Sequence, residues 1–247
     1  MISFRSHILV LILSLFYVNL FGQGKTLTFS LQVEPLIPSD LIRSNNVKAY
    51  VDAVEFSSDP LRGIGYGAGV SYHFHPKLAL QTGINYLKRD SKITATELND
   101  FTLELRYTVD NFEIPLTANY FVRLGEKVYM DGSVGFSFQF LPGELKSRKS
   151  LQNDIGGYIY DFSQISWRNY WVMPVFRGGF GFEYRTEKSG SFYIGPVFRL
   201  FSTLYYTQIL YMHNDINISN LVIKPAGDYF SIAFKYICPH ETPKKEK

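Results

Sequence analysis

Apolar and polar residues alternate strictly through long segments of this chain. Between residues 63 and 74 the odd positions are glycine, serine or histidine, whereas the even positions are apolar or aromatic. A period of two is the pattern of a β-strand with two different faces. The same alternation recurs in seven further segments, at residues 27–34, 78–88, 103–122, 128–140, 176–185, 192–201 and 230–236. The sequence therefore predicts eight strands, and no segment keeps a helical period of 3.6 residues over three turns.

The connections between the predicted strands alternate in length. Short connections lie near residues 75–77, 123–126 and 186–191, and long ones near 36–62, 89–101, 142–168 and 207–227. Short turns at one end and long loops at the other are typical of outer-membrane barrels. An even number of strands places both ends of the chain at the short-turn, periplasmic side.

A soluble barrel and a membrane barrel would place the apolar row on opposite sides. In a soluble barrel the other row would meet water, but here that row is largely Gly and Ser with few charges. Eight strands enclose an interior that side chains just fill, so inward glycines leave room. We expect the glycines at residues 63–69 to make space for Arg177, Tyr193, Arg199 and Phe201.

The predicted fold class is therefore all-β, an eight-stranded antiparallel transmembrane β-barrel with short periplasmic turns and long extracellular loops. Tyr, Phe and Trp residues near both ends of the strands fit the two aromatic belts of such a barrel. A secreted soluble sandwich is the alternative.

The first residues have the features of a secretory signal peptide. Arg5 and His7 precede residues 8–21, which are apolar with two exceptions and too few to span a bilayer. A buried first helix is the alternative, although nothing downstream looks helical enough to pack against it. We expect a signal peptide at residues 1–22, the barrel at residues 23–238 and a short polar periplasmic tail at residues 239–247.

The composition fits a folded chain with little surface in water. Of the 247 residues, 17% are aromatic and 19% are charged, below the roughly 25% of soluble domains, which argues against disorder. Lys and Arg are scattered and the net charge is only +3, which argues against a nucleic-acid partner. Cys238 is the only cysteine, which excludes an intrachain disulfide and a Cys-based zinc or iron–sulfur site.

Three segments resemble the PorT-like outer-membrane β-barrel family of Gram-negative bacteria. They are the glycine-alternating strand at residues 63–74, the sequence LALQTGINY at residues 78–86 and the sequence FEIPL at residues 112–116. The resemblance spans most of the chain after residue 22 and ends at residues 238–247, which extend past the last strand. It implies a barrel in the outer membrane. Some members are linked to protein secretion, so it also implies envelope or secretion proteins as partners.

An interior group of charges is the most informative polar feature. The sequence PVFR occurs at residues 174–177 and again at residues 196–199. Counted from the nearest short turn, Arg177 and Arg199 lie about ten residues up and face inward, and Glu113 lies at a similar height. The sequence predicts an interior salt-bridge cluster of these three residues that holds the barrel closed. A gate or transport path is the alternative.

Three prolines, Pro115, Pro174 and Pro196, fall inside predicted strands. Since proline lacks a backbone donor for the ladder, we expect a β-bulge at each of them.

Candidate chemistry is otherwise sparse. His73 and His75 lie around a turn without an obvious third metal ligand. His213, Asp215 and Ser219 are the nearest candidates for a catalytic group at the extracellular rim, but a triad is recognised by geometry and not by sequence proximity. We therefore predict no catalytic residues, no metal and no cofactor. The predicted function is that of a non-enzymatic barrel in contact with outer-membrane lipid and with envelope or secretion proteins. A rim enzyme and a small gated pore are the alternatives.

Overall fold

The computed structural model describes residues 26–39, 47–51, 54–97, 102–141, 143–153, 158–186, 189–200, 205–213, 216–224 and 228–239. The predicted signal peptide at residues 1–22 and residues 240–247 of the predicted tail lie outside these ranges. The described residues form thirteen strands: β1 (Thr26–Pro38), β2 (Val47–Val51), β3 (Val54–His75), β4 (Leu78–Glu97), β5 (Thr102–Arg123), β6 (Val128–Phe140), β7 (Leu145–Asn153), β8 (Tyr158–Arg168), β9 (Val172–Arg185), β10 (Ser191–Leu200), β11 (Tyr205–His213), β12 (Ile216–Ile223) and β13 (Tyr229–Ile237). Within these ranges, no helix is long and apolar enough to cross a membrane.

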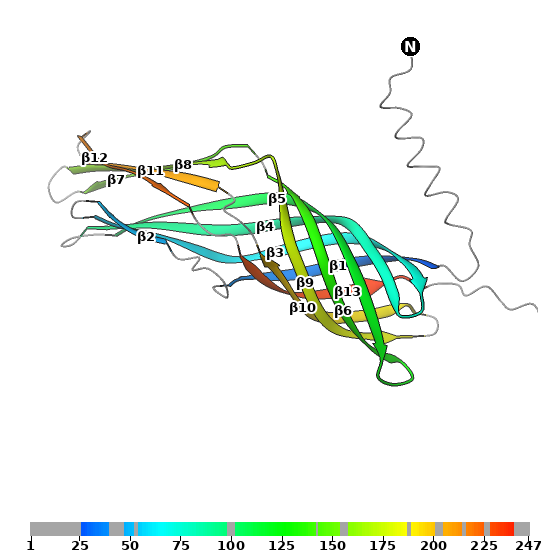
Figure 1. Ribbon diagram of the computed structural model, residues 1–247. Coiled ribbons are helices and arrows are strands. Elements are labelled where there is room, and N and C mark those ends of the chain that lie inside the picture. Colours follow the sequence, from blue (N-terminus) through cyan, green and yellow to red (C-terminus); the bar gives the residue numbers. More distant parts are fainter. Residues whose placement is uncertain are drawn as a thin grey trace, which may run out of the picture.

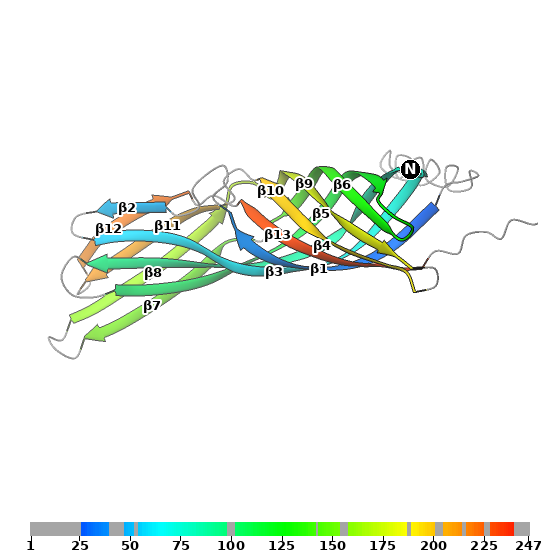
Figure 2. The same ribbon diagram turned by 90° about the horizontal axis from the view of Figure 1, so that it is seen from below.

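Eight of the described strands close into a ring (Figure 1). The neighbour order is β1, β13, β10, β9, β6, β5, β4 and β3, and pairing of β1 with β3 closes the circle. Each ring strand corresponds to one segment predicted from the alternation, so the predicted eight-stranded antiparallel barrel is confirmed. The short turns after β3, β5 and β9 lie at the same end of the barrel as the start of β1 and the end of β13 (Figure 2).

The strands at the other end extend far beyond the ring. β5 has 22 residues, or about 70 Å of extended chain, whereas about 9–11 residues cross a bilayer. The outer parts of β3, β4 and β5 continue into one layer that also contains β2, and the four-stranded sheet β12-β11-β8-β7 forms a second layer (Figures 1 and 2). We call these two layers the platform. The long connections are thus present where the sequence places them, but much of their length is regular strand.

The platform has an apolar core of its own. Phe56, Ile93 and Leu103 from the first layer meet Phe162 and Ile209 from the second, and each of these side chains is at most 1% exposed. A dry core between two sheets is the packing of a soluble β-sandwich. The platform is therefore an ordered body rather than a set of separate loops.

The polarity of β5 inverts along its length. Odd-numbered side chains point inward over the whole strand. In the platform the inward row is apolar and the outward row is polar; the inward residues are Leu103, Leu105, Tyr107 and Val109, and the outward ones include Glu104, Arg106 and Asp110. In the ring the inward row is mainly polar and the outward row is apolar; the inward residues include Asn111, Glu113, Thr117 and Asn119, and the outward ones Phe112, Ile114, Leu116 and Tyr120. The inversion falls between Asp110 and Phe112. Because only the surrounding medium can reverse both rows together, this level is the boundary between lipid and water.

β-Bulges do not occur at the prolines where the sequence predicts them. Pro115 faces Ser137, Pro174 faces Phe138 and Pro196 faces Ile232, and the register is the same on both sides of each. Each N–H in an antiparallel ladder points to one neighbour only, so a proline removes one donor without inserting a residue. The register of β3 against β4 shifts instead between Pro60 and Gly63, where the strand passes from the platform into the ring, and again between His73 and His75 at the short turn.

The inversion of β5 gives a prediction with a control on the same face of the same strand. Leu116→Arg places a cation in the middle of the outward apolar row, where Leu116 is 54% exposed, and should cost about 2–4 kcal/mol of folding free energy. Thr102→Arg lies on the water-facing part of that row and should change stability by no more than about 0.5 kcal/mol. Urea unfolding in lipid vesicles measures both. Equal effects of the two variants would show that the boundary is misplaced.

Candidate functional site

Two arginines face each other inside the barrel. Arg177 on β9 and Arg199 on β10 are direct partners in the antiparallel register, and each comes from one copy of the repeated PVFR sequence. Both side chains point inward and are at most 5% exposed. Like charges directly opposite on neighbouring strands repel, so the pair requires anions between them.

Glu113 supplies one of these anions, as the sequence predicts. Its carboxylate accepts from Arg199 Nε at 2.9 Å and from Arg177 Nη1. Glu113 lies on β5, three places around the ring from β10, so this contact crosses the interior. The structure therefore brings the three predicted residues together.

Glu34 on β1 supplies a second anion that sequence reasoning missed. Its carboxylate accepts from Arg199 Nη2 at 2.6 Å and from Arg177 Nη2 at 3.2 Å, and the side chain is 1% exposed. Glu34 belongs to the polar row of the first strand, but β1 has no turn at its base from which to count its height. Its register partner Gly65 would have given the height, because Gly65 lies ten residues before His75 at the β3–β4 turn. We call Glu34, Glu113, Arg177 and Arg199 the charge quartet.

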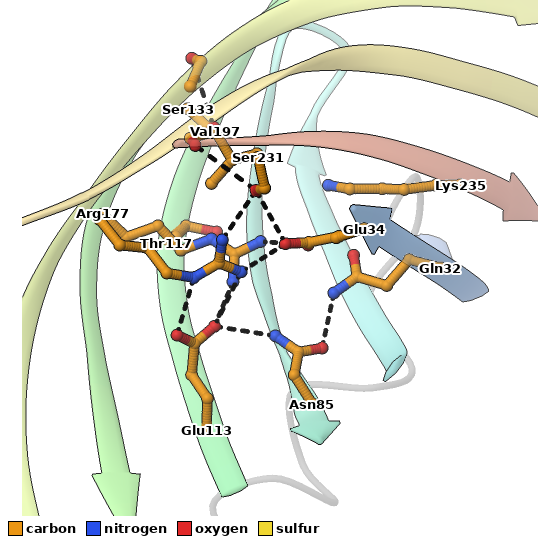
Figure 3. Close-up of polar contacts among 12 residues, drawn as sticks. Gln32, Glu34, Asn85, Glu113, Thr117, Ser133, Arg177, Val197, Ser231 and Lys235 are labelled. Atoms are coloured by element: carbon orange, nitrogen blue, oxygen red, sulfur yellow. Dashed lines mark hydrogen bonds and ion pairs between the residues drawn. The ribbon is translucent and has the colours of Figure 1, made fainter. Parts of the chain in front are cut away.

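A ring of polar side chains surrounds the charge quartet (Figure 3). Asn85 on β4 donates to Glu113 Oε1 at 2.9 Å. Gln139 on β6 donates to Glu113 Oε2 at 3.0 Å. Ser231 on β13 accepts from Arg199 Nη1 at 2.8 Å and donates to Glu34 Oε2 at 3.0 Å. With the charge quartet itself, seven of the eight ring strands contribute a side chain to one network.

The remaining ring strand, β3, contributes space. A Cβ at Gly67 would clash with Oδ1 of Asn85, and one at Gly65 would lie 2.7 Å from Leu87 Cδ2. The glycine row therefore makes room for side chains of β1 and β4. The prediction that it makes room for Arg177, Tyr193 and Arg199 is wrong, and Phe201 lies outside the described residues. The Tyr193 ring instead covers Gly181 on the neighbouring strand β9.

The network closes the interior at this level. Two positive and two negative charges cancel within hydrogen-bond distance, and no member of the charge quartet is more than 5% exposed. Directly above it, Arg89 donates to Asn111 Oδ1 at 2.8 Å, and both are at most 2% exposed. The apolar core of the platform begins there with residues such as Leu87 and Met173. A buried, fully paired arrangement of this kind can hold strands together across the interior.

The other candidate residues form no comparable group. His73 Nε2 lies 3.3 Å from Thr28 Oγ1, and His75 Nδ1 accepts from the backbone N–H of Lys77. In the described part of the chain, no three His, Cys, Asp or Glu side chains come together as metal ligands would. Asp215 lies outside the described residues, as do the side chains of His213 and Ser219.

Comparison with known proteins identifies a family. Residues 43–208, about two thirds of the chain, match the family described as outer membrane protein beta-barrel domain. No curated protein sequence matches the chain.

The solved structures that are similar to this chain include two outer-membrane barrels. The outer membrane protein OprG from Pseudomonas aeruginosa aligns over 87% of this chain and 97% of its own, at 13% identity and a TM-score of 0.49. The β domain of the Bordetella autotransporter BrkA aligns over 86% and 99%, at 9% identity and a TM-score of 0.27. Neither structure is similar enough to carry an argument about this chain.

The charge quartet gives a stability prediction in which one change is worse than four. Glu113→Gln leaves Arg177 and Arg199 facing each other with a single carboxylate and should destabilise the barrel by about 3–5 kcal/mol. Replacing the charge quartet together (Glu34→Gln, Glu113→Gln, Arg177→Met, Arg199→Met) removes every buried charge and should cost less. Urea unfolding in vesicles measures both variants. A quadruple variant less stable than the single one would contradict this account of the cluster.

Proposed function

The chain belongs to the outer membrane protein beta-barrel domain family and is a protein of the cell outer membrane, and from this premise we propose that it is a closed, non-enzymatic barrel whose platform binds a protein partner of the cell envelope. The platform is the observation that carries the proposal. A barrel that serves only as an anchor needs strands of about 9–11 residues, whereas β3, β4 and β5 have 20 to 22. Their outer parts form an ordered β-sandwich in water, which is a surface suited to recognition.

The closed interior supports a binding role over a conducting one. Ions would have to pass the charge quartet, then Arg89 and Asn111, and then the apolar core of the platform. The polar atoms of the charge quartet bond to one another and to their neighbours, so none is presented to a substrate. This saturation also favours a non-enzymatic protein over a catalyst inside the barrel.

The seam between β5 and β7 is the part of the platform best suited to a partner. Among the residues that the structure describes, the outer part of β5 pairs only with β4, and β7 pairs only with β8, so two strand edges face each other without a ladder. A groove of about 510 Å³ lies at this seam, lined by Arg106 and Thr108 of β5 and by Leu145 and Lys146 of β7 among others. Unpaired strand edges accept extended segments of other proteins by main-chain hydrogen bonds.

One contact shows which backbone groups of β5 face the seam. Lys149 Nζ on β7 donates to the backbone carbonyl of Glu104 at 3.3 Å. Since alternate residues of a strand direct their N–H and C=O groups to the same side, those of Thr108 face the seam too. The basic side chains Arg106 and Lys146 and the acidic side chain of Asp90 border the groove, and the two cations already pair with Glu104 and Glu144. An extended segment would therefore be held there mainly by main-chain hydrogen bonds.

The resemblance of residues 63–86 and 112–116 to PorT-like barrels supports a partner in secretion or envelope assembly. A rim enzyme and a small gated pore are the competing functions.

A crosslinking experiment tests the proposed function. A photoreactive amino acid at Lys146, 65% exposed beside the groove, should capture one defined protein in intact cells, and the same amino acid at lipid-facing Phe180 should not. Thr108→Pro removes an N–H from the seam and should abolish the crosslink from Lys146. Thr108→Ala loses the same hydroxyl but retains the N–H, and should preserve the crosslink. A crosslink that is equal in both variants, or absent in the wild type, would refute partner binding at the seam.

A conductance measurement tests the closed interior. The purified barrel in planar bilayers should give no stepwise current, because the charge quartet and the platform core block the path. Stable unitary currents from the wild-type protein would favour the gated pore instead.

A further inference from the structure

A cavity lies below the charge quartet, in the half of the barrel that ends at the short turns. Its volume is about 610 Å³, and its walls include the turn residues His75 and Lys77, so it opens toward the periplasm. The seam described above lies at the opposite end of the molecule. This volume is within the range of about 300–1,000 Å³ that is typical of pockets for small organic ligands.

One cation in the wall of this cavity has no ionic partner. Lys235 Nζ lies 3.4 Å from Gln81 Oε1 and 4.7 Å from the centre of the Tyr193 ring, and no carboxylate oxygen of the described residues lies within 4.0 Å. An ionisable side chain inside the membrane span without a counter-ion is expensive and indicates a functional site.

A buried hydroxyl lies close to the same point. Ser30 lines the cavity, is 6% exposed, and its Oγ has no hydrogen-bond partner. A Cβ built at Gly69 would lie 2.8 Å from Ser30 Oγ and 3.2 Å from Gln81 Nε2, so the hydroxyl lies beside the side chain that contacts Lys235. Ser30 lies two residues from Gln32, the register partner of Lys235, so the orphaned hydroxyl and the ammonium without an ion pair are diagonal neighbours in the cavity wall. An anionic ligand would complete both groups.

The carboxylates of the cavity are already engaged. Glu183 accepts two hydrogen bonds from Arg185, at 2.8 Å and 3.3 Å, and Asp131 accepts two from Asn119, at 3.2 Å and 3.0 Å. The charged lining comprises the four cations Lys77, Arg123, Arg185 and Lys235 and the two anions Asp131 and Glu183. The cavity therefore attracts anions.

We infer that this cavity binds a carboxylate with an apolar body, delivered from the periplasm. The ammonium of Lys235 pairs with the carboxylate and the hydroxyl of Ser30 donates to it. Phe121, Tyr129 and Tyr193 in the wall surround the apolar body. The carboxylate is that of a free small acid or of a polypeptide C-terminus, since both present the same group. The inference is independent of partner binding at the seam.

Calorimetric titration of the folded, detergent-solubilised protein tests this site with two matched pairs of probes. The first pair is 4-phenylbutyrate and its neutral amide, and the second is acetyl-Ala-Ala-Phe with a free or an amidated C-terminus. At least one acid should bind, and its amide should bind about tenfold more weakly or not at all, because the amide lacks the charge. Binding of phenylbutyrate alone identifies a free acid as the ligand class, whereas binding of the tripeptide acid identifies a C-terminus.

The variants separate the site from a general charge effect. Lys235→Met retains the stem over Tyr193 and should weaken binding of the acid at least about tenfold, and Ser30→Ala should weaken it to a smaller degree. Lys92→Met removes a cation from the platform and should leave binding unchanged. Heat-modifiable migration on gels confirms that each variant is folded, and Ser30→Ala provides the test if Lys235→Met does not fold. The inference is overturned if neither acid binds, if acid and amide bind equally, or if the folded Lys235 and Ser30 variants bind as the wild type does.

Discussion

Arg177 and Arg199 face each other on neighbouring strands at a level of the barrel where neither lipid nor bulk water can neutralise them. The rest of the interior follows from this constraint. Two carboxylates, Glu34 and Glu113, approach from β1 and β5 and lie between the guanidinium groups. Because these anions come from strands on other sides of the ring, neutralising the arginines also ties the ring together across its diameter. The two arginines thus repel each other, and by binding Glu34 and Glu113 they also connect strands across the barrel interior.

The closure allows one chain to form two bodies with opposite polarity. Below the charge quartet the barrel is polar inside and apolar outside, and above it the platform is apolar inside and polar outside. The odd-numbered side chains of β5 point inward in both bodies, so the strand stays continuous while the apolar and polar rows exchange places. The charge quartet and its neighbours Arg89 and Asn111 lie at this transition and separate the apolar core of the platform from the wet cavity below. The two ends of the molecule are therefore independent surfaces, one for the extracellular side and one for the periplasm.

Much of this architecture can be predicted from the sequence because the membrane part obeys a simple pattern. The eight ring strands follow from the alternation, and counting from the short turns brings Glu113, Arg177 and Arg199 to one level. The count fails for Glu34, since β1 begins without a turn, although its side chain lies on the polar row. The platform is harder to predict because its strands are apolar inside and polar outside, as in a soluble protein, which is the reverse of the membrane part. The exchange of apolar and polar rows between Asp110 and Phe112 can be read in the sequence, but it does not show which strands cover Leu103 and Leu105.

The prolines and glycines show a second limit of sequence reasoning. Pro115, Pro174 and Pro196 each remove one ladder donor, and the register alone decides whether a residue is inserted as well. The glycine row of β3 indicates that space is needed, but not which side chains use it. Gly67 makes room for Asn85 of an adjacent strand, which in turn supports Glu113. Such relations between strands depend on pairing, which a pattern along one strand does not contain.

The inversion at the level of the charge quartet is most directly tested by spin labels along β5 in lipid bilayers. Single cysteines at residues 102–120, in a Cys238→Ser background, report collisions with oxygen in lipid and with a water-soluble nickel complex. Even positions from 112 to 120 should be accessible to oxygen, even positions from 102 to 110 to the nickel complex, and odd positions from 103 to 117 to neither, whereas residue 119 lines the periplasmic cavity and should be accessible to the nickel complex. Oxygen accessibility that continues through residues 104 and 106, or nickel accessibility at residues 111 and 113, would contradict a closed barrel that carries an inverted platform.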